Sequence, residues 1–193
     1  MNKIFIIVDL EATCYDREDK NKPIGFQNEI IEIGAVKCDE QGNILDEFQM
    51  FLKPKKHPLI SEFCTTLTTI TQNDIYHAVD AQTGLSQFFE WSLGLFHEDA
   101  DKVKFVSWGH YDRNQFRDDL KLNGLDKELI NDGNHYSLKH LHGEWNKLKR
   151  PVGLGWACKF EKIEFTGTAH RGIDDARNIA KIFKKYVTRF LAL

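Results

Sequence analysis

The sequence predicts an α/β fold in which helices flank a mixed sheet. Three apolar segments with strand character stand early in the chain, and helical patterns and one further strand follow them. Strands first, with helices around them, is the pattern of a sheet held between helical layers. No linker rich in Pro, Gly or Ser and no internal repeat divides the chain, so we expect a single domain spanning residues 1–193.

The predicted elements follow in chain order. A run of apolar residues at 4–8 is the first strand, and residues 30–37 and 44–52 form a meander with it. The spacing of Leu and Phe side chains predicts a helix over residues 81–96, and a short strand follows at 104–107. Later helices are predicted at residues 113–122, 137–148, 154–160 and 172–190.

Composition excludes several classes of protein. The formal net charge of -3 argues against a strongly basic nucleic-acid scaffold, although it leaves a nucleic-acid substrate open. The four cysteines are widely spaced and lack a C-x-x-C pair, which argues against a disulfide framework and a structural zinc site. The first apolar run is too short for a signal peptide or a membrane span. We therefore expect a cytoplasmic protein with no membrane partner.

Two carboxylates stand directly after the first apolar run. Asp9 and Glu11 stand two residues apart, so in a strand their side chains point to the same face. At the edge of a buried strand they repel each other unless a cation lies between them. The pair predicts a metal site that needs further ligands from elsewhere in the chain.

Other acids stand at two later element boundaries. Asp112 follows the fourth predicted strand, at the edge where α/β sheets commonly bind ligands, and a helix N-cap is the alternative role. In the last helix, Asp175 shares a mostly apolar row with Ile179 and Ile182. Asp174 lies on the solvated row instead. We therefore expect Asp175 to be the ligand and Asp174 to be a cap or helix-dipole partner.

His170 lies just before the last helix and would be a neighbour of Asp175, with an ordinary surface histidine as the alternative. Four carboxylates from separate elements and one histidine match the needs of two-metal hydrolysis of a phosphodiester. Oxygen ligands favour two divalent cations, Mg²⁺ or Mn²⁺. A neutral imidazole at His170 would accept the proton of the attacking water.

The same residues stand in motifs that resemble the DEDDh 3′-to-5′ exonucleases, the group with RNase T and the proofreading subunit of bacterial DNA polymerase III. Asp9 and Glu11 carry the first motif, Asp112 the second, and His170 with Asp175 the third. The similarity runs closer to the Eri-type and bacterial KapD-like branch. It is carried by the segments VDLEATC, NEIIEIGAV, FCTTLTTITQ, SWGHYD and HRGIDDARNIA, in this order.

The resemblance implies an RNase H-like fold with a five-stranded mixed sheet and two bound divalent cations. It also implies release of nucleoside 5′-monophosphates from single-stranded 3′ ends, with RNA favoured over DNA. By matching position, the four carboxylates hold the metals and His170 is the general base. Glu11 gains a second duty at the terminal hydroxyl. Ala12 and Thr13 would lie under the terminal nucleotide.

Four further side chains are candidates for substrate contacts. Phe63, Leu67 and Tyr111 could stack on or wedge the terminal bases, because single-strand binders use aromatic and apolar faces without reading sequence. Burial in the core is an equally open alternative for Phe63. Arg171 stands beside His170, where it could meet a phosphate.

The chain departs from the branch at two positions. Thr69 stands where the branch usually has Gly, and His110 where it commonly has an acid. Neither removes a ligand, but Thr69 puts the shape of its loop in doubt. A catalytically weak regulator that binds nucleic-acid ends, or a DNA-directed exonuclease of the proofreading type, are the alternative functions. No obligate protein partner is evident from the sequence.

Overall fold

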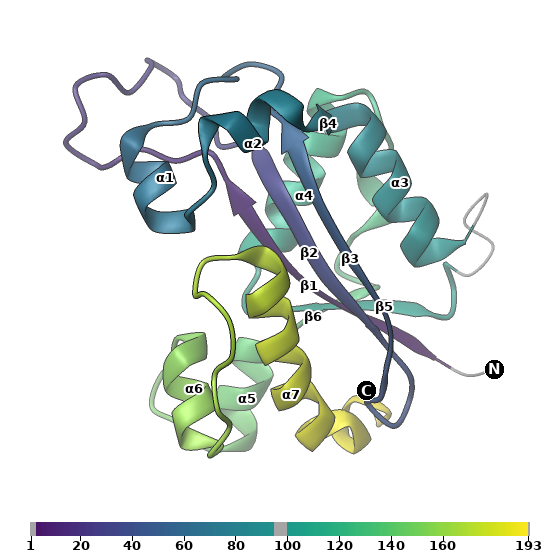
Figure 1. The fold of residues 1–193 in the computed structure, drawn as a ribbon. Coiled ribbons are helices and arrows are strands. Elements are labelled where there is room, and N and C mark those ends of the chain that lie inside the picture. Colours follow the sequence, from purple (N-terminus) through teal and green to yellow (C-terminus); the bar gives the residue numbers. More distant parts are fainter. Residues whose placement is uncertain (1–2, 95–99, 193) are drawn as a thin grey trace.

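Helices cover both faces of a twisted sheet in the computed structural model, which describes residues 3–94 and 100–192 (Figure 1). This confirms the predicted α/β class. The strands are β1 (Ile4–Ala12), β2 (Ile30–Cys38), β3 (Ile44–Lys53), β4 (Val79–Asp80), β5 (Val103–Ser107) and β6 (His135–Ser137). The helices are α1 (Glu62–Thr68), α2 (Gln72–His77), α3 (Ala81–Leu93), α4 (Tyr111–Leu122), α5 (Leu138–Trp145), α6 (Leu154–Phe160) and α7 (Gly172–Phe190), with a 3₁₀ turn at Lys127–Leu129.

The sheet is mixed, as predicted, but the expected number of strands was wrong. Within the described residues the order is β4-β3-β2-β1-β5-β6, which gives six strands rather than five. The meander β1-β2-β3 is antiparallel, whereas β5 and β6 extend the sheet in parallel on the other side of β1. The strand β4 has only two residues and pairs in parallel with the end of β3. A pairing this short leaves no periodic pattern in the sequence.

The observed elements differ from the predicted ones mainly at their ends. β1 continues to Ala12 because its backbone pairs with β2 beyond the apolar run. α3 ends at Leu93, and the predicted residues 95 and 96 lie outside the described residues. The short helices α1 and α2 were not predicted. None of the helices that the structure describes is both long enough and apolar enough to cross a membrane.

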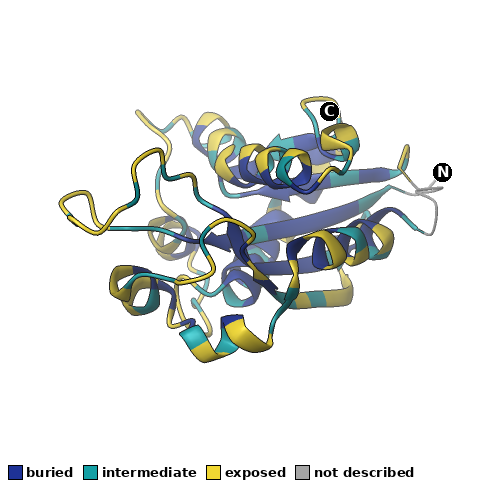
Figure 2. Cartoon of the chain, turned by 90° about the horizontal axis from the view of Figure 1, so that it is seen from above, coloured by how far each residue is buried: buried dark blue, intermediate teal, exposed yellow. Residues whose placement is uncertain are grey.

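The strand period of two divides the core between the two faces of the sheet. Phe5 and Ile7 of β1 pack beneath α7, where the Phe5 and Phe183 rings are 4.8 Å apart. Ile6 and Val8 point the other way, toward α3 and α4. Figure 2 shows the buried strands lying between helices whose outer surfaces are exposed. Full burial of an aromatic side chain such as Phe183 contributes about 2–3 kcal/mol.

Two glycines bring the start of α7 against the sheet. A Cβ on Gly34 of β2 would lie 2.0 Å from the Gly172 carbonyl carbon, and one on Gly172 would lie 2.9 Å from the Asp9 carbonyl oxygen. No real side chain fits at the shorter of these distances. The absence of a side chain at Gly34 therefore allows the first turn of α7 to lie beside the acidic end of β1.

Candidate metal centre

The acidic pair lies in regular strand geometry near the end of β1. Asp9 faces Gly34 and Glu11 faces Glu32 in the antiparallel register with β2. Asp9 is half-buried, and Glu11 is 8% exposed. Because the strand continues through both acids, their side chains share one face as the spacing predicts.

Asp112 connects α4 to the same strand. It is 5% exposed, and its Oδ1 accepts a hydrogen bond from the Leu10 backbone N–H at 3.1 Å. The N-cap of α4 is His110, so the alternative role of Asp112 as an N-cap is wrong. In the first turn of the helix, the positive end of the helix dipole favours a carboxylate.

Asp175 and His170 come together at the start of α7. The His170 backbone N–H donates to Asp175 Oδ2 at 3.0 Å. The other oxygen, Asp175 Oδ1, is buried and has no hydrogen-bond partner among the described residues. Asp174 has a different role, because it accepts from the Thr168 backbone N–H at 2.8 Å and pairs with Arg177 at 3.2 Å. Asp175 is 8% exposed and the Asp174 side chain is 21% exposed, which agrees with their different rows on the helix, and the ligand role of Asp175 stays a prediction.

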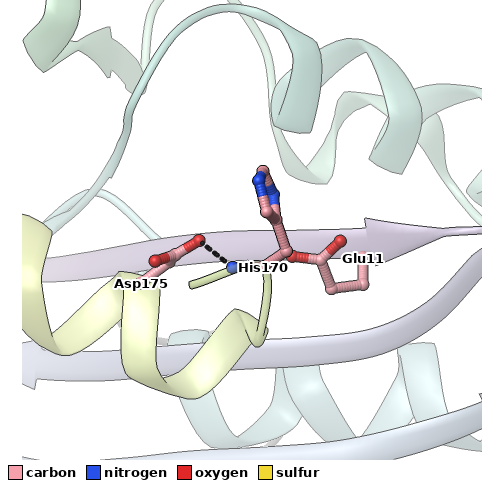
Figure 3. A group of neighbouring side chains, drawn as sticks. All are labelled: Glu11, His170 and Asp175. Atoms are coloured by element: carbon pink, nitrogen blue, oxygen red, sulfur yellow. Dashed lines mark hydrogen bonds between the residues drawn. The ribbon is translucent and has the colours of Figure 1, made fainter. Parts of the chain in front are cut away.

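Two of the four predicted ligands, Glu11 and Asp175, come together with the predicted base His170. Glu11, His170 and Asp175 each offer a ligand atom within 4.8 Å of the others, and Figure 3 shows the three side chains side by side. Asp9 and Asp112 lie close enough to act electrostatically on this group. An oxygen-rich set that includes a buried oxygen without a hydrogen-bond partner among the described residues fits a hard divalent cation, which is the kind of metal that the resemblance implies.

Burial and mutual repulsion raise the pKa values of these acids. Desolvation, followed by the charge of Asp175, raises the pKa of Glu11 to about 8. Desolvation raises the pKa of Asp112 to about 6, even though the Leu10 N–H opposes this shift. The pKa of Asp9 is raised well above its usual range by burial and by Asp112. Without a cation the site disfavours its own charges, and a bound cation would reverse that preference.

Sequence reasoning missed one acid in this region, Glu32. It is fully buried on β2 and interacts with Arg171 through a 3.1 Å contact between Nε and Oε2. The signal that identified Asp9, an acid inside an apolar strand, is also present in residues 30–33. Glu32 is a neighbour of the metal site and accepts hydrogen bonds from the chain.

The predicted substrate residues divide into exposed and buried sets. Phe63, Leu67 and Tyr111 are 39%, 37% and 49% exposed, so the alternative of a core position for Phe63 is wrong. Ala12 and Thr13 are buried, and Thr13 Oγ1 accepts the Glu29 backbone N–H at 2.9 Å. Nucleotide contacts by these residues stay predictions. The structure shows which side chains are accessible to a ligand.

The two departures from the family pattern have local explanations. Thr69 is the C-cap of α1 at φ 61°, a left-handed conformation that Gly adopts at lower cost. His110 is exposed, and its ring stacks on His140 with the centroids 4.7 Å apart. Desolvation, followed by the charges of His140 and Arg113, lowers the pKa of His110, which reduces any positive charge beside the acids.

Comparison with known proteins confirms the resemblance. The sequence model of the exonuclease family, RNase_T, matches residues 6–183. ERI1 exoribonuclease 2 of Homo sapiens is 32% identical over 200 residues, which cover 94% of this chain and 28% of the relative. The 3′-5′ exonuclease eri1 of Schizosaccharomyces pombe is 27% identical over 207 residues, which cover 95% of this chain and 67% of the relative. The chain thus spans less than a third of the human relative.

Solved structures share the fold. The nuclease domain of 3′hExo, a DEDDh family member bound to rAMP, superimposes with a TM-score of 0.82 at 24% identity, covering 97% of this chain and 93% of that domain. Exonuclease I of E. coli in complex with a dT13 oligonucleotide gives a TM-score of 0.74 at 15% identity, covering 97% of this chain and 41% of that protein. These similarities confirm the predicted RNase H-like fold.

Proposed function

Because the chain belongs to the RNase_T exonuclease family, we propose that it is a metal-dependent 3′-to-5′ exonuclease acting on single-stranded ends. The observation that carries the proposal is that Glu11, His170 and Asp175 offer ligand atoms within 4.8 Å of one another, and that Asp175 Oδ1 accepts no hydrogen bond from the residues that the structure describes. A module that only binds nucleic-acid ends has no need of a clustered, self-repelling set of acids. Relatives named as exoribonucleases support RNA as the preferred substrate.

The chemistry follows from the donor set. Asp9, Glu11, Asp112 and Asp175 would hold two divalent cations, with Mg²⁺ and Mn²⁺ suited to oxygen ligands. Such cations, when bound, supply water activation and charge stabilisation at the leaving oxygen. His170 is exposed at the edge of the cluster, where its imidazole accepts the proton of the attacking water. Cleavage of the P–O3′ bond releases a nucleoside 5′-monophosphate and leaves a 3′-hydroxyl on the shortened strand.

The substrate end would be gripped between α1 and the start of α4. Phe63 and Leu67 on α1, with Tyr111 on α4, present exposed apolar surface to the terminal bases. Ala12 and Thr13 would support the terminal nucleotide from below through backbone groups. Glu11 would hold the terminal hydroxyl as well as metal. The sequence predicts Arg171 as a phosphate contact, but its guanidinium interacts with Glu32, and this pairing competes with a contact to the strand.

The test is a digestion of matched single-stranded RNA, single-stranded DNA and duplex ends with Mg²⁺, with Mn²⁺ and with a chelator. We expect stepwise shortening from the 3′ end and 5′-monophosphate products, fastest on single-stranded RNA. Faster cleavage of DNA would favour the proofreading type. Binding of the strands without products in either metal would contradict the proposal.

A further inference from the structure

Glu32 is a buried carboxylate, and both of its oxygens accept hydrogen bonds from other residues of the protein. It is 0% exposed on β2. Its Oε2 accepts from Arg171 Nε and from the Gly172 backbone N–H, both at 3.1 Å, and its Oε1 accepts from Gln49 Nε2 at 2.8 Å. A buried carboxylate is costly unless such donors surround it, so the contacts are required for Glu32 to be buried there.

Two of these donors belong to the segment that carries His170. Arg171 is the N-cap of α7 and Gly172 is its first residue. His170 itself has φ 61°, a left-handed conformation that costs a non-glycine residue free energy and persists only where neighbours hold it. The segment is hydrogen-bonded to Glu32 through Arg171 and Gly172, and to Asp175, which accepts the His170 backbone N–H.

A second contact, with an aromatic ring, also holds the Arg171 guanidinium against the sheet. The guanidinium carbon lies 5.3 Å from the centre of the Phe51 ring, in a cation–π contact. Phe51 on β3 is directly opposite Glu32 in the β2–β3 register. Two residues of the sheet, Glu32 and Phe51, therefore hold the Arg171 side chain. Arg171 directly follows His170, whose imidazole has to be positioned for catalysis.

We propose that Glu32 and Arg171 form a clasp that positions His170 and the first turn of α7 for catalysis. The functional part of this inference rests on the proposed exonuclease activity. In this role the Arg171 guanidinium binds Glu32 and does not contact the strand. The pairing fixes the backbone next to His170 and so fixes the position of the imidazole. Glu32 and Arg171 are positioning residues, and their loss should lower the rate of the chemical step rather than the affinity for the strand.

A phosphate contact by Arg171 would behave differently. Each phosphate neutralised on a single strand contributes about 0.7 to the slope of log affinity against log salt concentration. Loss of such a contact would raise KM and flatten this slope. Loss of a positioning contact leaves both nearly unchanged and lowers kcat, because the misplaced base acts only in the transition state.

The experiment compares Arg171→Gln, Glu32→Gln and the double variant with Arg177→Gln, by steady-state cleavage of single-stranded RNA at several salt concentrations. Arg177 is a matched control, since it also connects α7 to the sheet through an ion pair, with Glu47. We expect kcat to fall about 10- to 100-fold in Arg171→Gln, with KM and its salt slope unchanged. The double variant should be no worse than the poorer single variant, and Arg177→Gln should match wild type.

Amide hydrogen exchange separates failure of the clasp from failure of the proposed activity. Arg171→Gln should exchange faster than wild type at residues 168–175, and Arg177→Gln should not, whether or not the protein cleaves RNA. Unchanged exchange, a raised KM with a flatter salt slope, or additive effects in the double variant would each overturn the proposal. Arg171 is partly exposed, so its variant tests the clasp even where Glu32→Gln does not fold.

Discussion

Buried carboxylates of this protein differ in the hydrogen-bond donors they have, and this difference separates acids that stabilise the fold from candidate metal ligands. Glu29, just before β2, is 1% exposed and accepts from the backbone N–H groups of Lys55, Lys56 and His57 at 2.6 to 3.0 Å. Asp175 is 8% exposed, yet its Oδ1 has no partner within the described part of the chain. Burial alone therefore does not mark a metal ligand. A buried carboxylate whose oxygens all accept hydrogen bonds stabilises the fold. A buried carboxylate that has an oxygen without a donor, and that lies beside other acids, is available to a cation.

The largest effect that this comparison predicts is on catalysis. Asp9→Asn or Asp175→Asn should lower Mg²⁺-dependent nucleotide release about 1000-fold, because a bound metal supplies several kcal/mol of transition-state stabilisation. The fold should be kept, since each change removes a repelled charge. Asp174→Asn is the matched control one residue away, and its rate should stay within about threefold of wild type. Equal losses in Asp174→Asn and Asp175→Asn would break the comparison.

Stability against pH tests the metal-site acids without a substrate. The pKa of Glu11 is raised to about 8 in the fold, so between its ordinary pKa and about 8 the folded state binds more protons than the unfolded state. Stability of the metal-free protein should therefore fall as the pH rises through this window, by on the order of 2–4 kcal/mol.

Calorimetric melting in chelator and in Mn²⁺ measures this dependence. Mn²⁺ should raise the melting temperature more at about pH 8 than at about pH 5, because the acids bind metal in their charged form. Glu11→Gln should flatten the metal-free curve. Stability that rises with pH in chelator would contradict the raised pKa values.

The Glu29 side of the comparison predicts loss of stability with activity retained. Glu29→Gln removes the charge that three backbone donors share, so we expect unfolding to become easier by about 2–3 kcal/mol. Urea denaturation followed by circular dichroism gives this change from the midpoint at constant slope. The folded variant should cleave RNA at a rate close to wild type, which would be the reverse of Asp175→Asn.

The candidate metal ligands stand out in the sequence because they break local rules. Asp9 and Glu11 interrupt an apolar strand, and Asp175 interrupts the apolar row of a helix. What the sequence alone leaves out is which acids receive donors from distant segments. Glu32 interrupts its strand in the same way as Asp9, yet its partner Arg171 is 139 residues away. Such pairings depend on the packing of α7 against the sheet, which no local pattern contains.

The elements that were not predicted from the sequence, among them β4, β6 and α2, were missed for a related reason. β4 and β6 contain two and three residues, too few to show a period of two. Their places are decided by pairing with β3 and β5. α2 did carry a local signal, since Thr71 and Asp74 form a capping box at its start. Short elements of this kind are stabilised by caps and by neighbours rather than by their own hydrophobic stripe.

The smallest predicted effect concerns an acid that has donors but is only partly buried. Asp74 Oδ2 accepts from the Thr71 backbone N–H at 2.8 Å and from Thr71 Oγ1 at 2.7 Å, on the exposed surface of α2. Asp74→Ala should cost about 0.5–1 kcal/mol, less than Glu29→Gln, because water replaces the lost contacts. Both variants go through the same urea titration, with the RNA cleavage rate measured in parallel and expected to be unchanged. A loss as large as that of Glu29→Gln would show that the donors, and not the degree of burial, set the stabilising effect of these carboxylates.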